Sequence, residues 1–189
     1  PEPGDGAQDG IFFQQFDATG NKIGGEIQAN TEWLDSQQVP AIASLPDGGW
    51  IITWSSFGQD GDSFGIYGQR FDSDGNMVSR DGLTPGSDEF HANTVTDSNQ
   101  TRSRVDTFDD GSWVVTWHSS ANPGGDGSSF GIYARRYGPD GVELDATEFQ
   151  VNQYTAGAQF NPTVTVLEDG GFLVTYQSYF QDWAENGAT

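Results

Sequence analysis

The sequence contains no cysteine, and only 7 of its 189 residues are lysine or arginine. Without cysteine, the chain can form neither a disulfide nor a thiolate metal site, and it cannot use a cysteine nucleophile. The 28 acidic residues leave a net charge of −21. A nucleic acid backbone is bound largely through lysine and arginine side chains that displace its counterions. We therefore expect no nucleic acid partner.

Long apolar runs are also missing. None approaches the roughly 20 residues that a transmembrane helix needs, and no basic amphipathic stretch is present. No segment keeps a helical apolar periodicity for long, so no substantial helix is expected. Glycine is abundant, with 26 residues, and aromatic residues make up 13% of the chain. This composition favours short strands joined by tight turns, and it predicts no membrane insertion.

The chain is built from an internal repeat of about 60 residues, in which three blocks recur in the same order. The first block is PAIASLPDGGWIITW (40–54), SRVDTFDDGSWVVTW (103–117) and PTVTVLEDGGFLVTY (162–176). The second block is GIFFQQFDATGN (10–21), GIYGQRFDSDGN (65–76) and GIYARRYGPDGV (131–142). The third block is EIQAN (26–30), EFHAN (89–93) and EFQVN (148–152).

Each unit is predicted to form four strands. The first block holds two strands joined by an Asp-Gly turn, and the second and third blocks hold one strand each. The apolar second strand predicts cover on both of its faces. Four-stranded antiparallel units of this kind are typical of β-propeller blades, whose first strand lies innermost. We expect packing between blades at Ile42, Val105 and Val164 in the first strands and at Ile52, Val115 and Val174 in the second strands.

The fold class predicted is all-β and β-propeller-like, with three four-stranded antiparallel repeats and one blade split between the termini. Within a single repeat domain (1–189), residues 1–30 supply the third and fourth strands of a blade, 40–94 and 103–153 are whole blades, and 160–189 supply first and second strands. Three blades are fewer than a closed propeller needs. We therefore expect a six-bladed homodimer joined through the termini.

Two other hypotheses remain open for the split blade. One is a compact three-fold monomer, β-prism-like, whose ends pair within one chain. The other follows from the alignment of both termini with the loop between second and third strands, where Asp5 and Asp182 each match Asp60. Because proteolysis concentrates in loop tips, this match predicts a piece of a longer repeat array.

The three units share the consensus DGGWxxTWxSxxQDGxxxGIYxQRFDxxGN followed by EFxVN. This pattern spans essentially the whole chain and resembles a repeat of very large secreted bacterial proteins, the calcium-binding, RTX-type adhesins and haemolysin-like proteins exported by type I systems. The glycine-rich nonapeptide of RTX β-rolls is absent, since Ser129 stands where that motif has aspartate. The resemblance implies a secreted protein, extracellular or at the cell surface, and a repeat module rather than an enzyme.

The loop after the second strand of each unit is rich in carboxylates. Asp60 and Asp62 are two residues apart, so both can reach one hard cation, and Gly61 lets backbone carbonyls join them. We therefore expect calcium as a cofactor. The further candidate ligands in equivalent or neighbouring positions are Asp5, Asp9, Asp126 and Asp182. The alternative is that these are Asp-Gly turns without a metal, as is expected for Asp47, Asp110 and Asp169.

Candidate ligand-binding residues are of two kinds. Aromatic residues in predicted loops can stack on a sugar ring, and they are Trp33, Phe57, Tyr179 and Trp183. Arg104 and Asp106 lie two apart on the innermost strand, where the other units have small residues, and they are expected either to pair or to anchor a ligand in the channel. His91 and His118 replace polar residues of the repeat and are expected to be exposed.

Three functions remain open on this basis. The leading hypothesis is an extracellular, non-enzymatic module for adhesion or ligand binding, calcium-dependent and carbohydrate-binding in a lectin-like way, with a glycan or another cell-surface ligand as partner. The alternative is a structural protein that assembles through its split blades. A second alternative is a carbohydrate-active enzyme on a propeller scaffold.

Overall fold

The computed structural model describes residues 9–32, 34–83, 85–86, 88–120, 130–179 and 181. The elements in these ranges are all strands, and their pairings are antiparallel. The predicted all-β class is therefore confirmed. No helix in this part of the chain is long and apolar enough to span a membrane.

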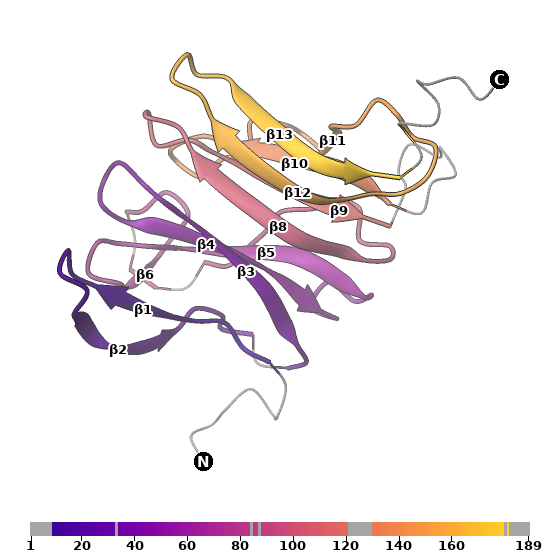
Figure 1. The fold of residues 1–189 in the computed structure, drawn as a ribbon. Helices are drawn as coiled ribbons and strands as arrows, with labels where there is room; N and C mark the ends of the chain where they lie inside the picture. Colours follow the sequence, from indigo (N-terminus) through magenta and orange to yellow (C-terminus); the bar gives the residue numbers. More distant parts are fainter. Residues whose placement is uncertain are drawn as a thin grey trace.

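The strands form four sheets that follow one another along the chain (Figure 1). The N-terminal hairpin consists of β1 (Phe12–Phe16) and β2 (Lys22–Gln28). The first sheet contains β3 (Gln37–Ser44), β4 (Trp50–Phe57), β5 (Phe64–Phe71), β6 (Met77–Val78) and β7 (Phe90–His91). The second sheet contains β8 (Gln100–Thr107), β9 (Trp113–Ser119), β10 (Gly131–Tyr137) and β11 (Phe149–Gln150). The C-terminal hairpin consists of β12 (Gln159–Val166) and β13 (Phe172–Ser178).

The two larger sheets have one arrangement in common, as the sequence repeat predicts. The strand order β3-β4-β5 corresponds to β8-β9-β10. Trp50 of β4 lies opposite Phe71 of β5, just as Trp113 of β9 lies opposite Tyr137 of β10. The first strands of the units, β3, β8 and β12, lie side by side through the middle of the molecule (Figure 1). The sequence repeats are therefore structural units.

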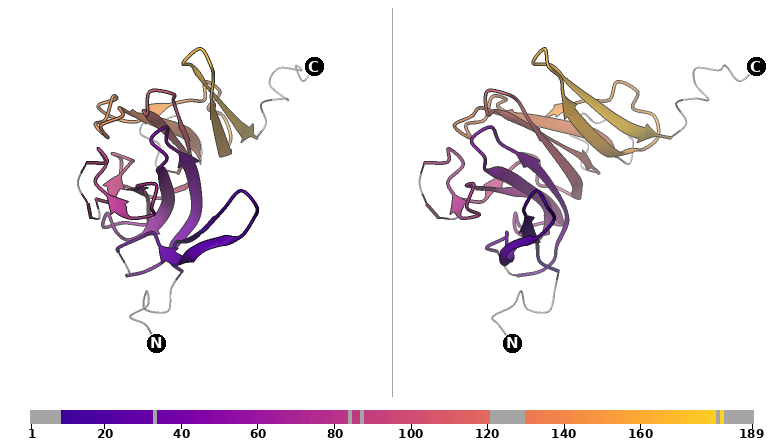
Figure 2. Two further views of the ribbon diagram at one scale, coloured as in Figure 1. Left: turned by 90° about the vertical axis from the view of Figure 1, so that its left-hand side faces the viewer. Right: turned by 60° about the vertical axis from the view of Figure 1, so that its left-hand side comes forward.

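The two terminal hairpins lie at opposite ends of the molecule, and the sheets follow one another along an arc between them (Figure 2). In the described part of the chain, β1 pairs only with β2, and β13 pairs only with β12. The compact three-fold monomer, in which the two ends complete one sheet within a chain, is therefore wrong. Each end of the molecule presents half of a four-stranded unit.

The core consists of apolar layers between consecutive sheets. One cluster joins Ile51 and Ile66 of the first sheet to Trp113, Val115 and Trp117 of the second. Another joins the N-terminal hairpin to the opposite face of the first sheet, and its residues include Ile11, Phe13, Ile52, Trp54 and Phe71. Neighbouring residues of β4 thus point into different layers, because successive side chains of a strand alternate between faces. The expected cover on both faces of the second strand is confirmed for β4 and β9.

Ile42 departs from the predicted packing between sheets. Ile52, Val105 and Val115 are buried as expected, and Val164 and Val174 are half-buried, but Ile42 is 62% exposed. Ile42 lines two apolar clefts of about 320 and 160 Å³ between the N-terminal hairpin and the first sheet. Its expected partners are the first two strands of the preceding unit, and the N-terminal hairpin supplies only the last two.

Hairpin turns of the first block are closed by an aspartate, as predicted. The Oδ1 atoms of Asp47, Asp110 and Asp169 each accept a hydrogen bond of 2.9 Å from the backbone N–H two residues further on. The following glycines, among them Gly48 and Gly111, have φ values of 89° and 87°. Only glycine adopts this backbone conformation without strain, which explains the Asp-Gly pair in each turn.

A buried amide pair links each unit to the next. Asn93 Oδ1 accepts a hydrogen bond from Ile66 N–H (2.6 Å), and its Nδ2 donates to Val95 O (2.9 Å) and Gln100 Oε1 (3.3 Å). Asn30 and Asn152 form the same three kinds of contact. The asparagine that ends the EFxVN motif therefore ties the third strand of its unit to the first strand of the following one.

Candidate functional site

The predicted calcium ligands Asp60 and Asp62 bind different parts of the protein. The Asp60 side chain is only 3% exposed and lies over Gly65, where an added Cβ would come within 2.6 Å of Oδ2. Its Oδ2 is 3.4 Å from His91 Nε2, and the His91 ring stacks on Tyr67. Asp62 Oδ2 instead accepts a hydrogen bond from Ser98 N–H (2.8 Å). Asp62 thus ties this loop to the segment before β8, whereas Asp60 Oδ2 is buried and accepts no hydrogen bond from the described residues.

The other predicted calcium ligands give no further support. Asp9 Oδ2 accepts hydrogen bonds from Ser36 Oγ (3.2 Å) and Gln38 Nε2 (3.5 Å). Asp5, Asp126 and Asp182 lie outside the described residues. Among the residues that the structure does describe, no group of three or more acidic or histidine side chains could hold a metal ion. Calcium binding therefore stays a prediction.

The predicted aromatic platforms are exposed where the structure describes them. Phe57 is 42% exposed and contacts the ring of Phe64 edge-on. Tyr179 is 56% exposed, and its ring centroid lies 5.3 Å from that of Phe160. Trp33 and Trp183 lie outside the described residues.

Arg104 and Asp106 do not pair with each other. Arg104 Nη1 donates a hydrogen bond to Ser103 O (2.7 Å). Asp106 Oδ2 accepts one from Val166 N–H (2.7 Å), and Asp106 Oδ1 accepts one from Thr107 N–H (2.9 Å). Asp106 therefore holds β12 of the C-terminal hairpin against β8 of the second sheet.

A left-handed residue recurs in the innermost strand of every unit. Val39, Arg102 and Asn161 have φ values of 55°, 58° and 54°, and each lies at a register shift between the first and second strands. Residues other than glycine rarely adopt this conformation, and a β-branched valine least of all. The bulge donates backbone hydrogen bonds to the preceding unit, from Arg102 N–H to Ser55 Oγ (3.2 Å) and from Asn161 N–H to His118 Nδ1 (3.3 Å). No glycine marks these bulges, so they were not predicted from the sequence.

The prediction that His118 is exposed is wrong. The residue is 7% exposed, and Thr101 Oγ1 lies 2.6 Å from its Nε2. Because Nδ1 accepts from Asn161 N–H, Nε2 carries the proton and donates to Thr101. Burial, with a smaller contribution from the nearby Arg102, lowers the pKa of His118 to about 4. His91 is half-buried, and burial lowers its pKa in spite of the nearby Asp60.

Beside His118 is a cavity of about 350 Å³ between the second sheet and the C-terminal hairpin. Two bulge residues, one histidine and three aromatic residues line it, namely Arg102, Asn161, His118, Phe130, Phe160 and Tyr179. This cavity combines the exposed cation of Arg102 with the exposed ring of Tyr179, which is one of the predicted ligand-binding residues.

Searches against known proteins assign no family. No family model matches the chain, and no curated protein matches it. Among solved structures, a GH43 endo-arabinanase from Bacillus licheniformis is 14% identical, with a TM-score of 0.43, over 82% of this chain and 57% of that one. A thermostable family-43 glycoside hydrolase is also 14% identical, with a TM-score of 0.43, over 88% and 61%. The chain thus spans less than two thirds of the length of each, and at this level of similarity neither indicates what it does.

Proposed function

We propose that this chain is a non-enzymatic repeat module of the β-propeller type that assembles with a second copy of itself through its terminal hairpins. The observation that carries the proposal is the pair of unpaired edges. β4 pairs with β5 and β9 with β10, but the equivalent strands β13 and β1 have no such partner in the described part of the chain. β13 of one copy and β1 of a second copy would complete a four-stranded unit.

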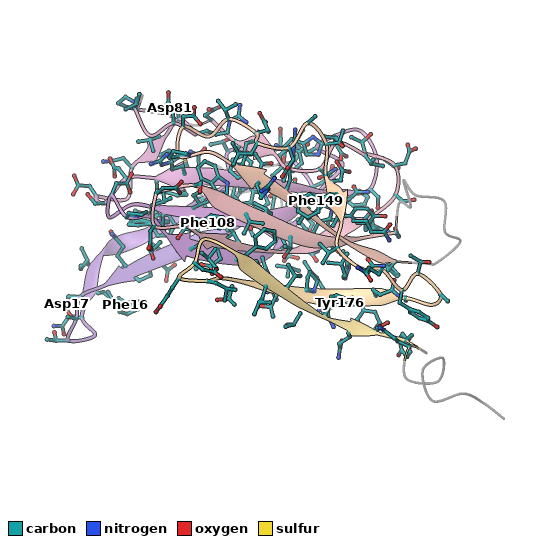
Figure 3. All side chains as sticks on the ribbon, turned by 90° about the horizontal axis from the view of Figure 1, so that it is seen from above. Phe16, Asp17, Asp81, Phe108, Phe149 and Tyr176 are labelled. Atoms are coloured by element: carbon teal, nitrogen blue, oxygen red, sulfur yellow. The ribbon has the colours of Figure 1, made fainter. Side chains whose placement is uncertain are left out.

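The repeat fixes the register of this pairing. Trp50 lies opposite Phe71 and Trp54 opposite Tyr67 in the first sheet, and the second sheet has the same pairs at equivalent positions. Transferred to the hairpins, this register places Phe172 opposite Phe16, and Tyr176 opposite Phe12, of the second copy. Figure 3 shows Phe16 and Tyr176 in separate hairpins of one chain, which do not pair with each other, and the proposal takes the pairing strand from a second copy.

Exposed apolar residues mark the same two surfaces. Ile42 is 62% exposed, whereas Val105, at the equivalent position of the second sheet, is 8% exposed. Leu173 is 55% exposed, whereas Ile51 and Val114, its equivalents, are fully buried. The proposed assembly lays the Leu173 face of one copy over the Ile42 clefts of the other. Burying the exposed half of each such side chain is worth about 1–2 kcal/mol.

A polar contact that already joins neighbouring units supports the same arrangement. The Glu148 carboxylate accepts hydrogen bonds from the backbone N–H groups of Thr94 and Val95, and the Glu89 carboxylate accepts one from Thr31 N–H. Glu26 is the equivalent residue of the N-terminal hairpin and is exposed. In the assembly it would accept from the N–H of Gln153 in the second copy. Two copies satisfy both ends at once, as a closed two-fold dimer requires.

The mass in solution tests the proposal. Sedimentation equilibrium should give about 41 kDa, twice the 20.4 kDa of one chain. The variants Leu173→Asp and Ile42→Asp should remain folded, because both side chains are exposed in one copy, and should sediment as monomers. Leu83→Asp is the matched control, since Leu83 is 82% exposed and outside the proposed interface. A wild-type mass of one chain, or dimeric Leu173→Asp and Ile42→Asp variants, would contradict the proposal.

The proposal also includes an extracellular location and calcium as a cofactor. An extracellular location is supported by the resemblance of the repeat to those of secreted bacterial adhesins. Calcium is supported by the Asp-Gly loops alone, and a rise in melting temperature with millimolar calcium would test it. Carbohydrate binding is the second candidate function, and the exposed ring of Tyr179 at the mouth of a cavity favours it.

A further inference from the structure

Arg102 differs from the other arginines because its guanidinium has neither an ion pair nor a hydrogen bond among the described residues. The chain has four acidic residues for every basic one, and three of its six arginines form ion pairs. Arg70 contacts Asp47, Arg80 contacts Glu143, and Arg136 contacts Asp145, at 2.7 to 2.8 Å. Arg135 donates to three backbone carbonyls. In the described residues, the guanidinium of Arg102 has no ion pair and no side-chain hydrogen bond, although Arg102 is exposed beside a cavity.

The backbone holds Arg102 at the mouth of that cavity. Its φ of 58° places it in the left-handed bulge of β8, and its N–H is fixed by Ser55 Oγ of the first sheet. Two other polar residues of the cavity are already bound to the protein. His118 bonds to Thr101 and to Asn161 N–H, and Asn161 Nδ2 donates to Gln177 Oε1 (2.6 Å). The guanidinium is therefore the group available to a ligand.

The remaining wall is aromatic. Tyr179 is 56% exposed, and its ring meets that of Phe160 at an angle of 48°. Phe130 contacts the His118 ring edge-on, with centroids 5.2 Å apart. Ligand sites of about this volume, near 350 Å³, are typically lined by aromatic side chains with a few polar groups that fix orientation. A guanidinium binds a carboxylate through two parallel hydrogen bonds.

We propose that this cavity binds a sugar that carries a carboxylate, such as a uronic acid residue of an acidic polysaccharide. The carboxylate binds Arg102, and a face of the sugar ring stacks on Tyr179. The site lies within one chain, between β8, β9 and the C-terminal hairpin, so it does not depend on the proposed assembly.

A second cavity, between the N-terminal hairpin and the first sheet, has the opposite chemistry. It measures about 520 Å³ and is lined by Asp9, Gln38 and the bulge residue Val39, among others. By the repeat alignment, Asp9 replaces Phe130, and Gln38 replaces Phe160. A carboxylate in place of an aromatic ring repels an anionic sugar. Of these two cavities, only the one beside Arg102 suits an anionic sugar.

Calorimetric titration at fixed salt tests the proposal, with tri-galacturonate as the probe and the neutral galactose trisaccharide and acetate as comparisons. Tri-galacturonate should bind with a millimolar or lower dissociation constant, and the two comparisons at least about tenfold more weakly, since a charged hydrogen bond contributes that much. Arg102→Gln and Tyr179→Ala should each weaken binding about tenfold, whereas Arg104→Gln should not change it. Arg102→Lys should retain part of the affinity.

Several outcomes would overturn the proposal. These are no tri-galacturonate binding at millimolar concentration, equal binding of the neutral trisaccharide, and an Arg102→Gln variant that binds like the wild type. Acetate binding as strong as that of the sugar, with no effect of Tyr179→Ala, would show a simple anion site instead. The melting temperature of each variant shows whether it is folded. The mass in solution should be the same for all variants and the wild type, which separates this test from that of the assembly.

Discussion

The amide pair between Asn93 and Gln100 should be a major source of stability. Asn93 is 2% exposed and makes three hydrogen bonds to other parts of the chain. Asn93→Ala leaves Ile66 N–H, Val95 O and Gln100 Oε1 without this partner. Each unsatisfied buried group costs about 1–3 kcal/mol, so the free energy of unfolding should fall by about 3–5 kcal/mol. That is a large share of the roughly 5–15 kcal/mol of a typical domain.

Urea unfolding, followed by the fluorescence of the buried Trp113 and Trp117, measures this loss at a fixed protein concentration. The midpoint should fall while the slope stays the same. Asn93→Asp retains the acceptor for Ile66 N–H but places a buried carboxylate against Val95 O and Gln100 Oε1, so at neutral pH it should lose at least as much stability as Asn93→Ala. Asn21→Ala is the control, because Asn21 is an exposed turn residue. If Asn93→Ala loses no more stability than Asn21→Ala, the pair does not hold the units together.

Three further predictions concern the hairpins and His118. Oxidation of a Gln14→Cys/Val174→Cys variant should give a covalent dimer on a non-reducing gel, because the proposed register places these residues opposite each other; a yield no higher than that of the single variants would contradict the register. The pKa of His118 is lowered to about 4 in the folded state, so protons bind the unfolded state first, and stability should fall as the pH drops from 6.5 towards 4. Melting curves of a His118→Gln variant should show a smaller loss over this range, and an unchanged loss would assign it to other groups. Asp106→Ala should lower stability by about 1–3 kcal/mol and speed hydrogen exchange at Val166 N–H, and unchanged exchange at Val166 would show that the contact does not hold β12.

The strands and turns were predictable because local rules determine them. The apolar run WIITW predicts cover on both faces of β4, and the Asp47-Gly48 turn follows from one side-chain hydrogen bond and one positive φ. The alignment of three units added the strand order. These features depend on neighbouring residues and on repetition within the sequence.

The features that the sequence analysis missed depend on contacts between units. The left-handed bulge at Val39 uses a residue that no local rule would place there, and the equivalent bulge residues Arg102 and Asn161 donate hydrogen bonds to the preceding unit. His118 was expected to be exposed because Ser55 and Gln177 occupy its position in other units, but the C-terminal hairpin covers it. The exposure of Ile42 also depends on a neighbouring unit, because the N-terminal hairpin lacks the two strands that would cover this side chain.

The distribution of charge favours covered edges. Proteins with free strand edges usually protect them with charged side chains or proline, because an unprotected edge pairs with other chains. In this chain, which carries a net charge of −21, β1 and β13 contain no charged residue. The first strands β3 and β12 are uncharged as well, whereas β8 contains Arg102, Arg104 and Asp106. In the proposed assembly no charged side chain of β1 or β13 is buried at the pairing edge, and the like charges on the remaining surface oppose other contacts between copies.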